Sequence, residues 1–299
     1  MAVELQGMLP VLQIPYNEDF TVNTAVLGTE IDWVIQHGAN GVVLAMASEI
    51  FRFTDAERDN LIAATVNAVS GRVPVIASVG GESIPQTVRH TQAAAQAGAD
   101  GVMAIPPTLT NCDAAMLETY YETILAVHSG PVVVQDASAY LGNSIPLSVQ
   151  ATLFNRHPER IHFKPERQPI GSTISCLRQE TGGKASIFEG MGGITLIDNY
   201  HRGIRGTMPG SEVPWAITLL WQALERNDME TAQRIQGPLS YIVAMLHNLD
   251  SIITAEKLYL REQGIFPNML IRPPVNYTLD DETMQELVRL LKILQDVCA

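Results

Sequence analysis

The sequence has few positively charged residues and no long apolar run. Its 299 residues include 19 lysines and arginines against 32 aspartates and glutamates, which gives a formal net charge of −13. The basic residues do not cluster, so nucleic acid and anionic membranes are not expected as partners. The start lacks the basic and apolar segments of a signal peptide, and no stretch of about 20 apolar residues follows. We therefore expect neither secretion nor membrane insertion.

Cysteine is also scarce, and its spacing matches no metal site. Cys112, Cys176 and Cys298 form no CxxC pair, so free thiols in a reducing cytoplasm are expected, without a bound metal. The first apolar run is followed by neither GxGxxG nor GxxxxGK[ST], which disfavours a dinucleotide fold or a P-loop.

What the sequence does have is a regular alternation of short apolar runs and helical patterns, which is typical of βα units around a parallel sheet. The pentapeptide at 38–42, GANGV, recurs as GADGV at 98–102, where a helix ends and a strand begins. The expected helices include Thr24–Gln36, Asp55–Val69, Ile84–Gln96, Asp113–Val127 and Leu147–Asn155. The eight expected strands are Leu9–Tyr16, Gly41–Ala47, Val73–Gly80, Gly101–Pro106, Pro131–Ala137, Ile161–Glu166, Ala185–Gly190 and Gly203–Met208.

Eight βα units predict an α/β fold, a (β/α)₈ TIM barrel over residues 1–227, with the active site at the carboxyl ends of the strands. A doubly wound open sheet is the structural alternative. Residues 228–299 predict a helical region, with helices at Met229–His247, Ser251–Glu262 and Asp281–Val297. Their apolar stripes, such as Leu287, Leu290, Leu291 and Leu294, favour core or subunit-interface packing.

Lys164 is the most informative single residue, because it is one of only four lysines and lies within an apolar strand. Strand alternation puts Ile161 and Phe163 on one face and His162, Lys164 and Glu166 on the other. Removal from water favours the neutral form of an amine, which attacks ketones to form a Schiff base. A structural pair between Lys164 and Glu166 is the alternative. Pro165 has no N–H and holds Lys164 in an extended backbone at the strand end.

The chain resembles the dihydrodipicolinate synthase / N-acetylneuraminate lyase family of Schiff-base enzymes from end to end. The matching segments are Ile14-Pro15-Tyr16, Ala45-Met46-Ala47-Ser48-Glu49, Val73-Pro74-Val75-Ile76-Ala77, Phe163-Lys164-Pro165-Glu166 and Gly203-Ile204-Arg205-Gly206. The lysine strand, sixth in order, is the specific match.

The resemblance implies that a 2-keto acid, such as pyruvate or a 2-keto-3-deoxy sugar acid, condenses with Lys164 without a cofactor. It also implies a homo-oligomer, either a dimer or a tetramer. The substrate carboxylate would bind backbone N–H groups of the turn after strand two. The substrate-binding residues implied in this way are Met46, Ala47, Ser48, Gln135, Ile204 and Gly206.

Several positions depart from the family pattern. The family's proton-relay tyrosine is replaced by Gln135, which does not titrate. The relay threonine aligns with Met46, and the tyrosine lent by a neighbouring subunit aligns with Thr108. Tyr140 replaces the arginine that holds a distal carboxylate. These losses predict that the chain is not a true dihydrodipicolinate synthase.

Another acid/base residue must therefore serve, and Glu166 is our first choice. Tyr140 is the second choice and Tyr16 the third. Each residue also has a non-catalytic interpretation: Glu166 as no more than an ion-pair partner of Lys164, Tyr140 as an ordinary loop aromatic, and Tyr16 as a side chain packed at the barrel rim. His162 fits a hydrogen-bonded core histidine better than a catalytic one. The glycine turns at 189–193 and 206–210 could cradle a phosphate, but tight turns explain them more simply.

Three functions compete at this point. The leading hypothesis is a class I lyase on 2-keto acids, either an aldolase that releases pyruvate or a dehydratase. The second is a catalytically silent keto-acid-binding barrel with a sensor or structural role. The third is a phosphate-binding barrel enzyme that uses the charge of Lys164.

Overall fold

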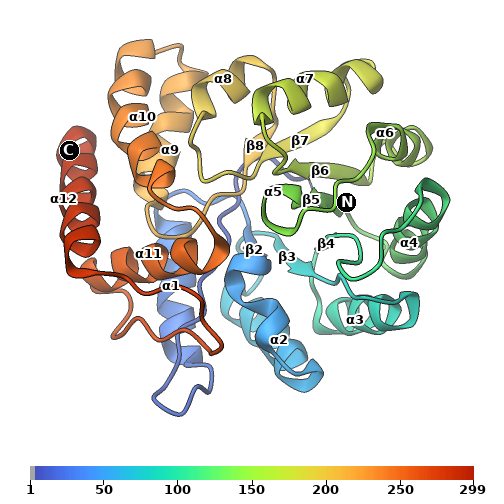
Figure 1. The fold of residues 1–299 in the computed structure, drawn as a ribbon, viewed down its shortest axis with the longest axis horizontal. Helices are drawn as coiled ribbons and strands as arrows, with labels where there is room; N and C mark the ends of the chain where they lie inside the picture. The colour runs from blue at the N-terminus through green and yellow to red at the C-terminus, as the bar shows by residue number, and fades with distance from the viewer. Residues whose placement is uncertain (1–3) are drawn as a thin grey trace.

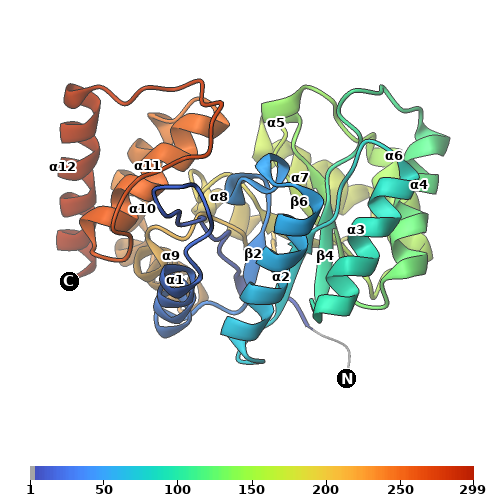
Figure 2. The ribbon, with the colours of Figure 1, turned by 90° about the horizontal axis from the view of Figure 1, so that it is seen from below.

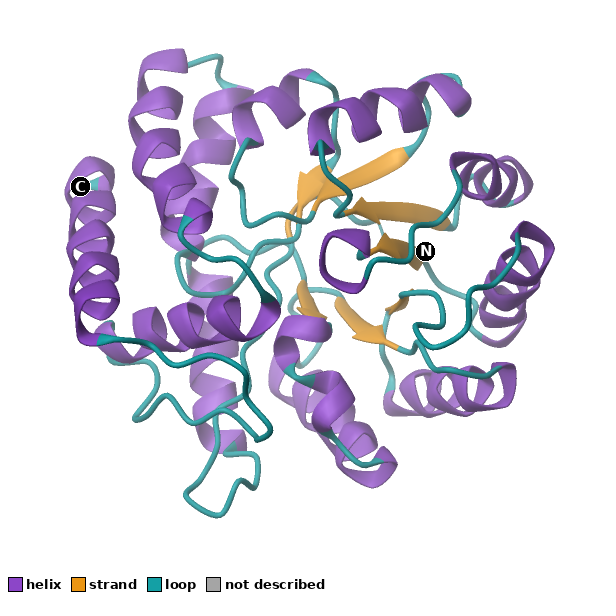
Figure 3. Cartoon of the chain, in the orientation of Figure 1, coloured by secondary structure: helices purple, strands orange, loops and turns teal. Residues whose placement is uncertain are grey.

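Eight parallel strands form the centre of the molecule in the computed structural model, which describes residues 4–299. The strands pair in the order β1-β8-β7-β6-β5-β4-β3-β2. Val11 bridges both Val43 and Gly210, and the N–H of Leu12 donates to the carbonyl of Val43 over 2.9 Å, which closes the ring between β1 and β2. The predicted (β/α)₈ barrel is thus confirmed, and the open sheet is excluded (Figures 1 and 3). The strands are β1 (Gly7–Met8), β2 (Val42–Leu44), β3 (Val75–Ser78), β4 (Gly101–Ala104), β5 (Val132–Asp136), β6 (Ile161–Pro165), β7 (Ser186–Glu189) and β8 (Gly206–Thr207).

Helices surround this barrel, and several begin at the residues that the sequence indicates. Thr54 accepts a hydrogen bond from the N–H of Glu57 at the start of α2, and Asp113 caps α4 in the same way. The helices of the barrel are α1 (Thr24–Gln36), α2 (Asp55–Val69), α3 (Ile84–Ala97), α4 (Ala114–Val127), α5 (Ser138–Leu141), α6 (Leu147–Arg156), α7 (Ile170–Glu180), α8 (Leu196–His201) and α9 (Pro214–Glu225), with the 3₁₀ turns η1 (Met46–Ser48) and η2 (Ile50–Arg52) after β2.

The first and last strands are shorter than predicted. Leu9–Tyr16 was expected to be one strand, but the regular strand is Gly7–Met8, just before this range, and Leu9–Tyr16 itself has only isolated bridges at Val11 and Tyr16. Pro10 has no N–H to donate to a ladder, which explains the interruption. The eighth strand likewise covers Gly206–Thr207 instead of Gly203–Met208.

Side chains of the strands alternate between two apolar layers. Ile161 and Phe163 point outward and pack in the large core between the barrel and the helices. Val43, Met103 and Phe188 belong to the cluster that fills the barrel. The predicted alternation in β6 therefore holds, and it turns Lys164 towards the interior side of the ring.

Three further helices, α10 (Met229–Ala244), α11 (Leu249–Glu262) and α12 (Asp281–Cys298), lie at one side of the barrel, beyond α1 and α9 (Figure 2). The α12 stripe is buried as predicted, with Leu287 and Leu294 fully inaccessible. Helix α11 contacts η1 and so reaches the carboxyl ends of the strands. The boundary at residue 227 stays a prediction. Within residues 4–299, no helix is long and apolar enough to cross a membrane.

Candidate active site

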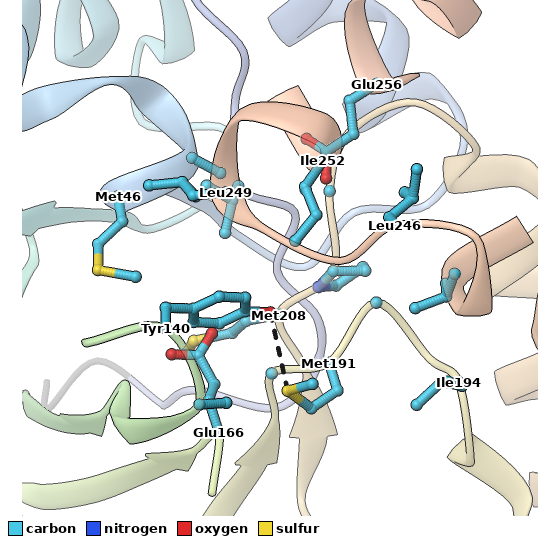
Figure 4. Close-up of a pocket in the computed structure, with 18 of the residues that line it drawn as sticks. Met46, Tyr140, Glu166, Met191, Ile194, Met208, Leu246, Leu249, Ile252 and Glu256 are labelled. Atoms are coloured by element: carbon cyan, nitrogen blue, oxygen red, sulfur yellow. Dashed lines mark hydrogen bonds between the residues drawn. The ribbon is translucent and has the colours of Figure 1, made fainter. Parts of the chain in front are cut away.

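A cavity of about 310 Å³ lies at the carboxyl ends of the barrel strands. Its wall is formed by the ends of β5 and β6, the loops after β7 and β8, the η1 turn, α5, and α10 and α11 with the segment that joins them (Figure 4). This is the end of the barrel where the sequence analysis expects chemistry.

Lys164 lies at the base of this cavity and is only 4% exposed. Its Nζ is 3.0 Å from Oε1 of Glu166. The other oxygen of Glu166 accepts a hydrogen bond of 2.7 Å from Nε2 of Gln135, which is the cross-strand partner of Lys164 in β5. Lys164, Glu166 and Gln135 thus form one buried group that faces the cavity. The sequence left two alternatives for Lys164, a structural pair with Glu166 or a position facing a cavity. In the structure both occur together.

Gly190 permits the close approach of the β7 end to this group. A Cβ atom at Gly190 would lie 2.8 Å from Cγ and Cε of Lys164 and from Cγ of Glu166. These distances are too short for any side chain, and the Cγ atoms lie too near the backbone to move aside. Glycine is therefore required for the position of the lysine.

The turn after β7 is held from within by Glu189. Its carboxylate accepts hydrogen bonds from the N–H of Met191 at 2.6 Å, the N–H of Gly193 at 3.1 Å and the hydroxyl of Thr207 at 2.7 Å. Burial raises the pKa of Glu189. Because these amides are already bonded to a carboxylate, the turn does not offer them to a phosphate, and the tight-turn interpretation is preferred.

Tyr140 reaches the cavity from α5. Its hydroxyl lies 3.8 Å from the sulfur of Met191 (Figure 4). Burial, with a smaller contribution from the charge of Glu166, raises the pKa of Tyr140 far above its ordinary value of 10.0. The phenol therefore stays protonated and is suited to donate a hydrogen bond rather than to shuttle protons.

Two other candidates lie away from the reacting end. Tyr16 does not line the cavity, and its ring packs under Nζ of Lys257 at 4.6 Å, so the structure does not bring this third choice for the acid/base residue to Lys164. His162 lies deeper in the barrel, with Nδ1 2.8 Å from the hydroxyl of Ser186. Burial lowers the pKa of His162 to about 4, in accord with the core-histidine interpretation.

The η1 turn presents two of its three expected amides. Met46 and Ala47 line the cavity, and within residues 4–299 their N–H groups have no hydrogen-bond acceptor. Ser48 is fully buried outside the cavity wall. Its N–H donates to the carbonyl of Ala45 at 3.0 Å and its hydroxyl to the carbonyl of Leu12 at 2.6 Å. The structure therefore does not bring the donors of Ser48 to the cavity, and its contact with substrate stays a prediction.

Ile204 and Gly206 also lie outside the cavity wall. Ile204 packs in the outer core, and Gly206 lies against the backbone of Gly7 inside the ladder. The chain reaches the cavity just after β8, at Met208, and lines it as far as Gly210. Both expected contacts lie too far towards the amino end of the strand.

The C-terminal helices form a wall of the cavity that was not predicted from the sequence. Apolar side chains there include Ile242, Leu246, Leu249 and Ile252. The same wall carries Glu256, and Glu212 lines the cavity beside it. The sequence did contain a signal for this wall. Glu256 and Lys257 are charged residues within the largely apolar stretch 251–260, just as Lys164 is a charged residue within an apolar strand.

Comparisons with known proteins agree with this geometry. The family model for the Dihydrodipicolinate synthetase family matches residues 4–294. An L-2-keto-3-deoxyarabonate dehydratase from Azospirillum brasilense is 29% identical over 297 residues, covering 97% of this chain and 94% of the relative. A 4-hydroxy-tetrahydrodipicolinate synthase from Methanospirillum hungatei is 24% identical, covering 97% and 98%.

Solved structures show the same fold. A prophage protein of the dihydrodipicolinic acid synthase family from E. coli K12, solved in complex with pyruvate, superposes with a TM-score of 0.89 at 21% identity, covering 97% of this chain and 99% of that one. The match of the family model over nearly the whole chain carries the assignment. The chain belongs to the dihydrodipicolinate synthetase family and is a lyase of that family.

Proposed function

We propose that the protein is a dehydratase of 2-keto-3-deoxy sugar acids that binds its substrate as a Schiff base on Lys164. The observation that carries the proposal is the buried contact of 3.0 Å between the Lys164 amine and the Glu166 carboxylate, at the base of the cavity. The relative named as a dehydratase of such an acid supports the choice of substrate class.

Imine formation uses the groups that surround the amine. Nζ of Lys164 attacks the C2 ketone, and Glu166 accepts a proton from the amine because its Oε1 lies 3.0 Å from Nζ. Glu166 passes this proton and a second one from the same nitrogen, which starts as an ammonium, to the C2 oxygen. The oxygen then leaves as water, the iminium remains, and Glu166 is again a carboxylate. The substrate carboxylate binds the N–H groups of Met46 and Ala47, which have no other acceptor within residues 4–299.

The elimination then depends on Glu166. The iminium draws electrons from C3, and the Glu166 carboxylate removes a C3 proton to leave an enamine. The enamine pushes out the C4 hydroxyl, which takes a proton from the carboxylic acid of Glu166 and leaves as water. A carboxylate beside the imine nitrogen lies close to C3, where this reaction needs a base.

Condensation with aspartate semialdehyde is not supported by these residues. Gln135 occupies the relay position and donates a hydrogen bond to Glu166 instead of titrating. Among residues 4–299, no arginine lines the cavity to hold a second carboxylate. Thr108 is bonded to Glu82 and does not line the cavity.

The test is an assay of the purified protein with a panel of 2-keto-3-deoxy sugar acids, followed by NMR of the products and by a separate measurement of released pyruvate. The proposal expects loss of water with all substrate carbons retained in one product. Stoichiometric pyruvate release would instead identify an aldolase. The absence of any product, together with tight keto-acid binding, would identify a silent binding barrel.

We also infer a homo-oligomer, a dimer or tetramer, in a reducing cytoplasm. Membership of the dihydrodipicolinate synthetase family, whose model matches residues 4–294, supports an interface between subunits. The free Cys112, Cys176 and Cys298 agree with a reducing compartment.

A further inference from the structure

The wall formed around α11 carries two carboxyl groups that the proposed chemistry does not use. Glu256 is buried, with an exposure of only 7%, and it lines the cavity together with Glu212. In Figure 4 the carboxylate of Glu256 lies on the opposite side of the drawn pocket from Glu166. Glu212 and Glu256 therefore face the tail of a substrate, the part beyond the carbons held at Lys164.

The two carboxyl groups lie against each other at Gly210. A Cβ atom on Gly210 would overlap both Oε2 of Glu212 and Oε1 of Glu256, so only glycine leaves room for the pair. Oε2 of Glu256 accepts a hydrogen bond from Nε2 of Gln13. Within residues 4–299, no group donates to Oε1 of Glu256 or to Oε2 of Glu212.

One oxygen of this pair, Oε2 of Glu212, is a buried acceptor without a donor, which is costly, and its place beside the cavity indicates that a ligand supplies the donor. The cavity itself supplies few donors. Lys164 is ion-paired with Glu166, and His247 is the other lining residue that can carry a positive charge. The ligand must therefore bring hydrogen-bond donors and no further negative charge.

We propose that Glu212 and Glu256 form a receptor for the hydroxyl groups of the substrate tail, so that the enzyme accepts 2-keto-3-deoxy acids with a neutral polyhydroxy tail and rejects those with a second carboxylate. This proposal rests on the proposed function and specifies which members of that substrate class are used.

The protonation of the pair fits a hydroxyl better than other groups. Burial raises the pKa of Glu212 to about 7. Burial, followed by the charges of Glu212 and Glu30, raises the pKa of Glu256 well above its ordinary value. Near neutral pH the pair therefore retains a proton and offers both a donor and an acceptor. A hydroxyl also donates and accepts, whereas a carboxylate only accepts and is repelled.

The experiment compares Glu256→Gln and Glu212→Gln with wild type on three probes. Pyruvate has no tail, a 2-keto-3-deoxypentonate has a hydroxylated tail, and a 2-keto-3-deoxy diacid of the same length has a charged tail. Pyruvate binding is measured by borohydride trapping on Lys164, and the two longer acids by steady-state kinetics. Glu30→Gln is the matched control, because it neutralises a fully buried carboxyl of the same cluster that does not line the cavity.

The receptor predicts that both cavity variants trap pyruvate as wild type does, while KM for the pentonate rises by about 10- to 100-fold, as expected for a lost hydrogen bond to a charged group. It also predicts a smaller preference for the pentonate over the diacid in these variants, and no such changes in Glu30→Gln.

Three results would overturn the receptor while the proposed function stands. These are an unchanged KM for the pentonate, an equal loss of pyruvate trapping, and an equal effect of Glu30→Gln. Failure of wild type itself to trap pyruvate would overturn the proposed function, and the receptor with it.

Discussion

Glu166 has two contacts that together define its proposed role. One carboxylate oxygen lies beside the Lys164 amine, and the other accepts a hydrogen bond from Gln135. The amide of Gln135 fixes the orientation of the carboxylate but cannot exchange protons with it. The carboxylate is thereby held between the amine of Lys164 and Gln135, the residue that aligns with the relay tyrosine of the resembled family.

We predict that Glu166→Gln retains the imine but not the elimination. The variant keeps the shape and a hydrogen-bond acceptor but cannot remove the C3 proton, so turnover should fall by about 10²–10⁴-fold. Borohydride should still trap the substrate on Lys164, as detected by mass spectrometry. Tyr140→Phe is the comparison. If that variant traps adduct without product while Glu166→Gln turns over normally, the shuttle is in α5 and the assignment of Glu166 is wrong.

At the scale of elements, the approach of the β7 end to β6 determines where the lysine points. A methyl group on Gly190 would lie only 2.8 Å from side-chain carbons of Lys164 and Glu166. The turn that follows is fixed by Glu189 and does not shift freely. The two strands therefore position the site jointly.

We predict that Gly190→Ala lowers kcat at least about tenfold, which corresponds to about 1.36 kcal/mol of activation free energy. A small displacement of the reacting amine is enough to cause a loss of this size. The added methyl displaces Lys164 or Glu166, but the surrounding barrel should remain folded by circular dichroism. Gly28→Ala in α1 is the matched control, since within the described structure nothing lies within 4 Å of its Cβ position. Equal activity of both variants would show that the packing at Gly190 does not position the lysine.

The sequence predicts most elements because their signals are local. Apolar runs and caps lie within each βα unit, so the bounds of α1 and α2 are obtained correctly and Lys164 is recognised as a charge in an apolar strand. The residues at strand ends depend on register, which is not local, so Ile204 and Gly206 are placed too early. Glu256 was missed because only the tertiary fold brings α11 to the mouth of the barrel.

At the scale of the whole molecule, several carboxyl groups are buried between the barrel and its surrounding helices. Glu30 of α1 is fully buried and accepts hydrogen bonds from the N–H of Gln13 at 2.8 Å and the hydroxyl of Ser211 at 2.6 Å. Burial raises the pKa of Glu30 from its ordinary 4.5 to about 8, although these hydrogen bonds and the charge of Lys257 oppose the shift. The folded protein therefore binds more protons than the unfolded chain between these pH values.

We predict that this carboxyl makes the protein less stable as the pH rises from 4.5 to 8. A carboxyl whose pKa is higher in the folded state contributes its full stabilisation at pH values below its unfolded-state pKa. This contribution is lost as the pH rises to the folded-state pKa, at a limiting slope of about 1.4 kcal/mol per pH unit. Glu30→Gln removes this titration. Its free energy of unfolding in urea should therefore rise relative to that of wild type as the pH increases across this range. A difference between the two proteins that does not change with pH would contradict the assignment.

The central claim, covalent catalysis through Lys164, is tested most directly by borohydride reduction in the presence of pyruvate, followed by peptide mass spectrometry. The account predicts one reduced pyruvyl adduct, located on Lys164, and none on Lys257, whose amine is bonded to Glu49 and to the carbonyl of Leu270. Lys164→Ala and Lys164→Arg should both lack the adduct and turnover, because a guanidinium stays protonated and forms no imine. An unmodified Lys164 in wild type, or substantial turnover in either variant, would contradict the Schiff-base mechanism.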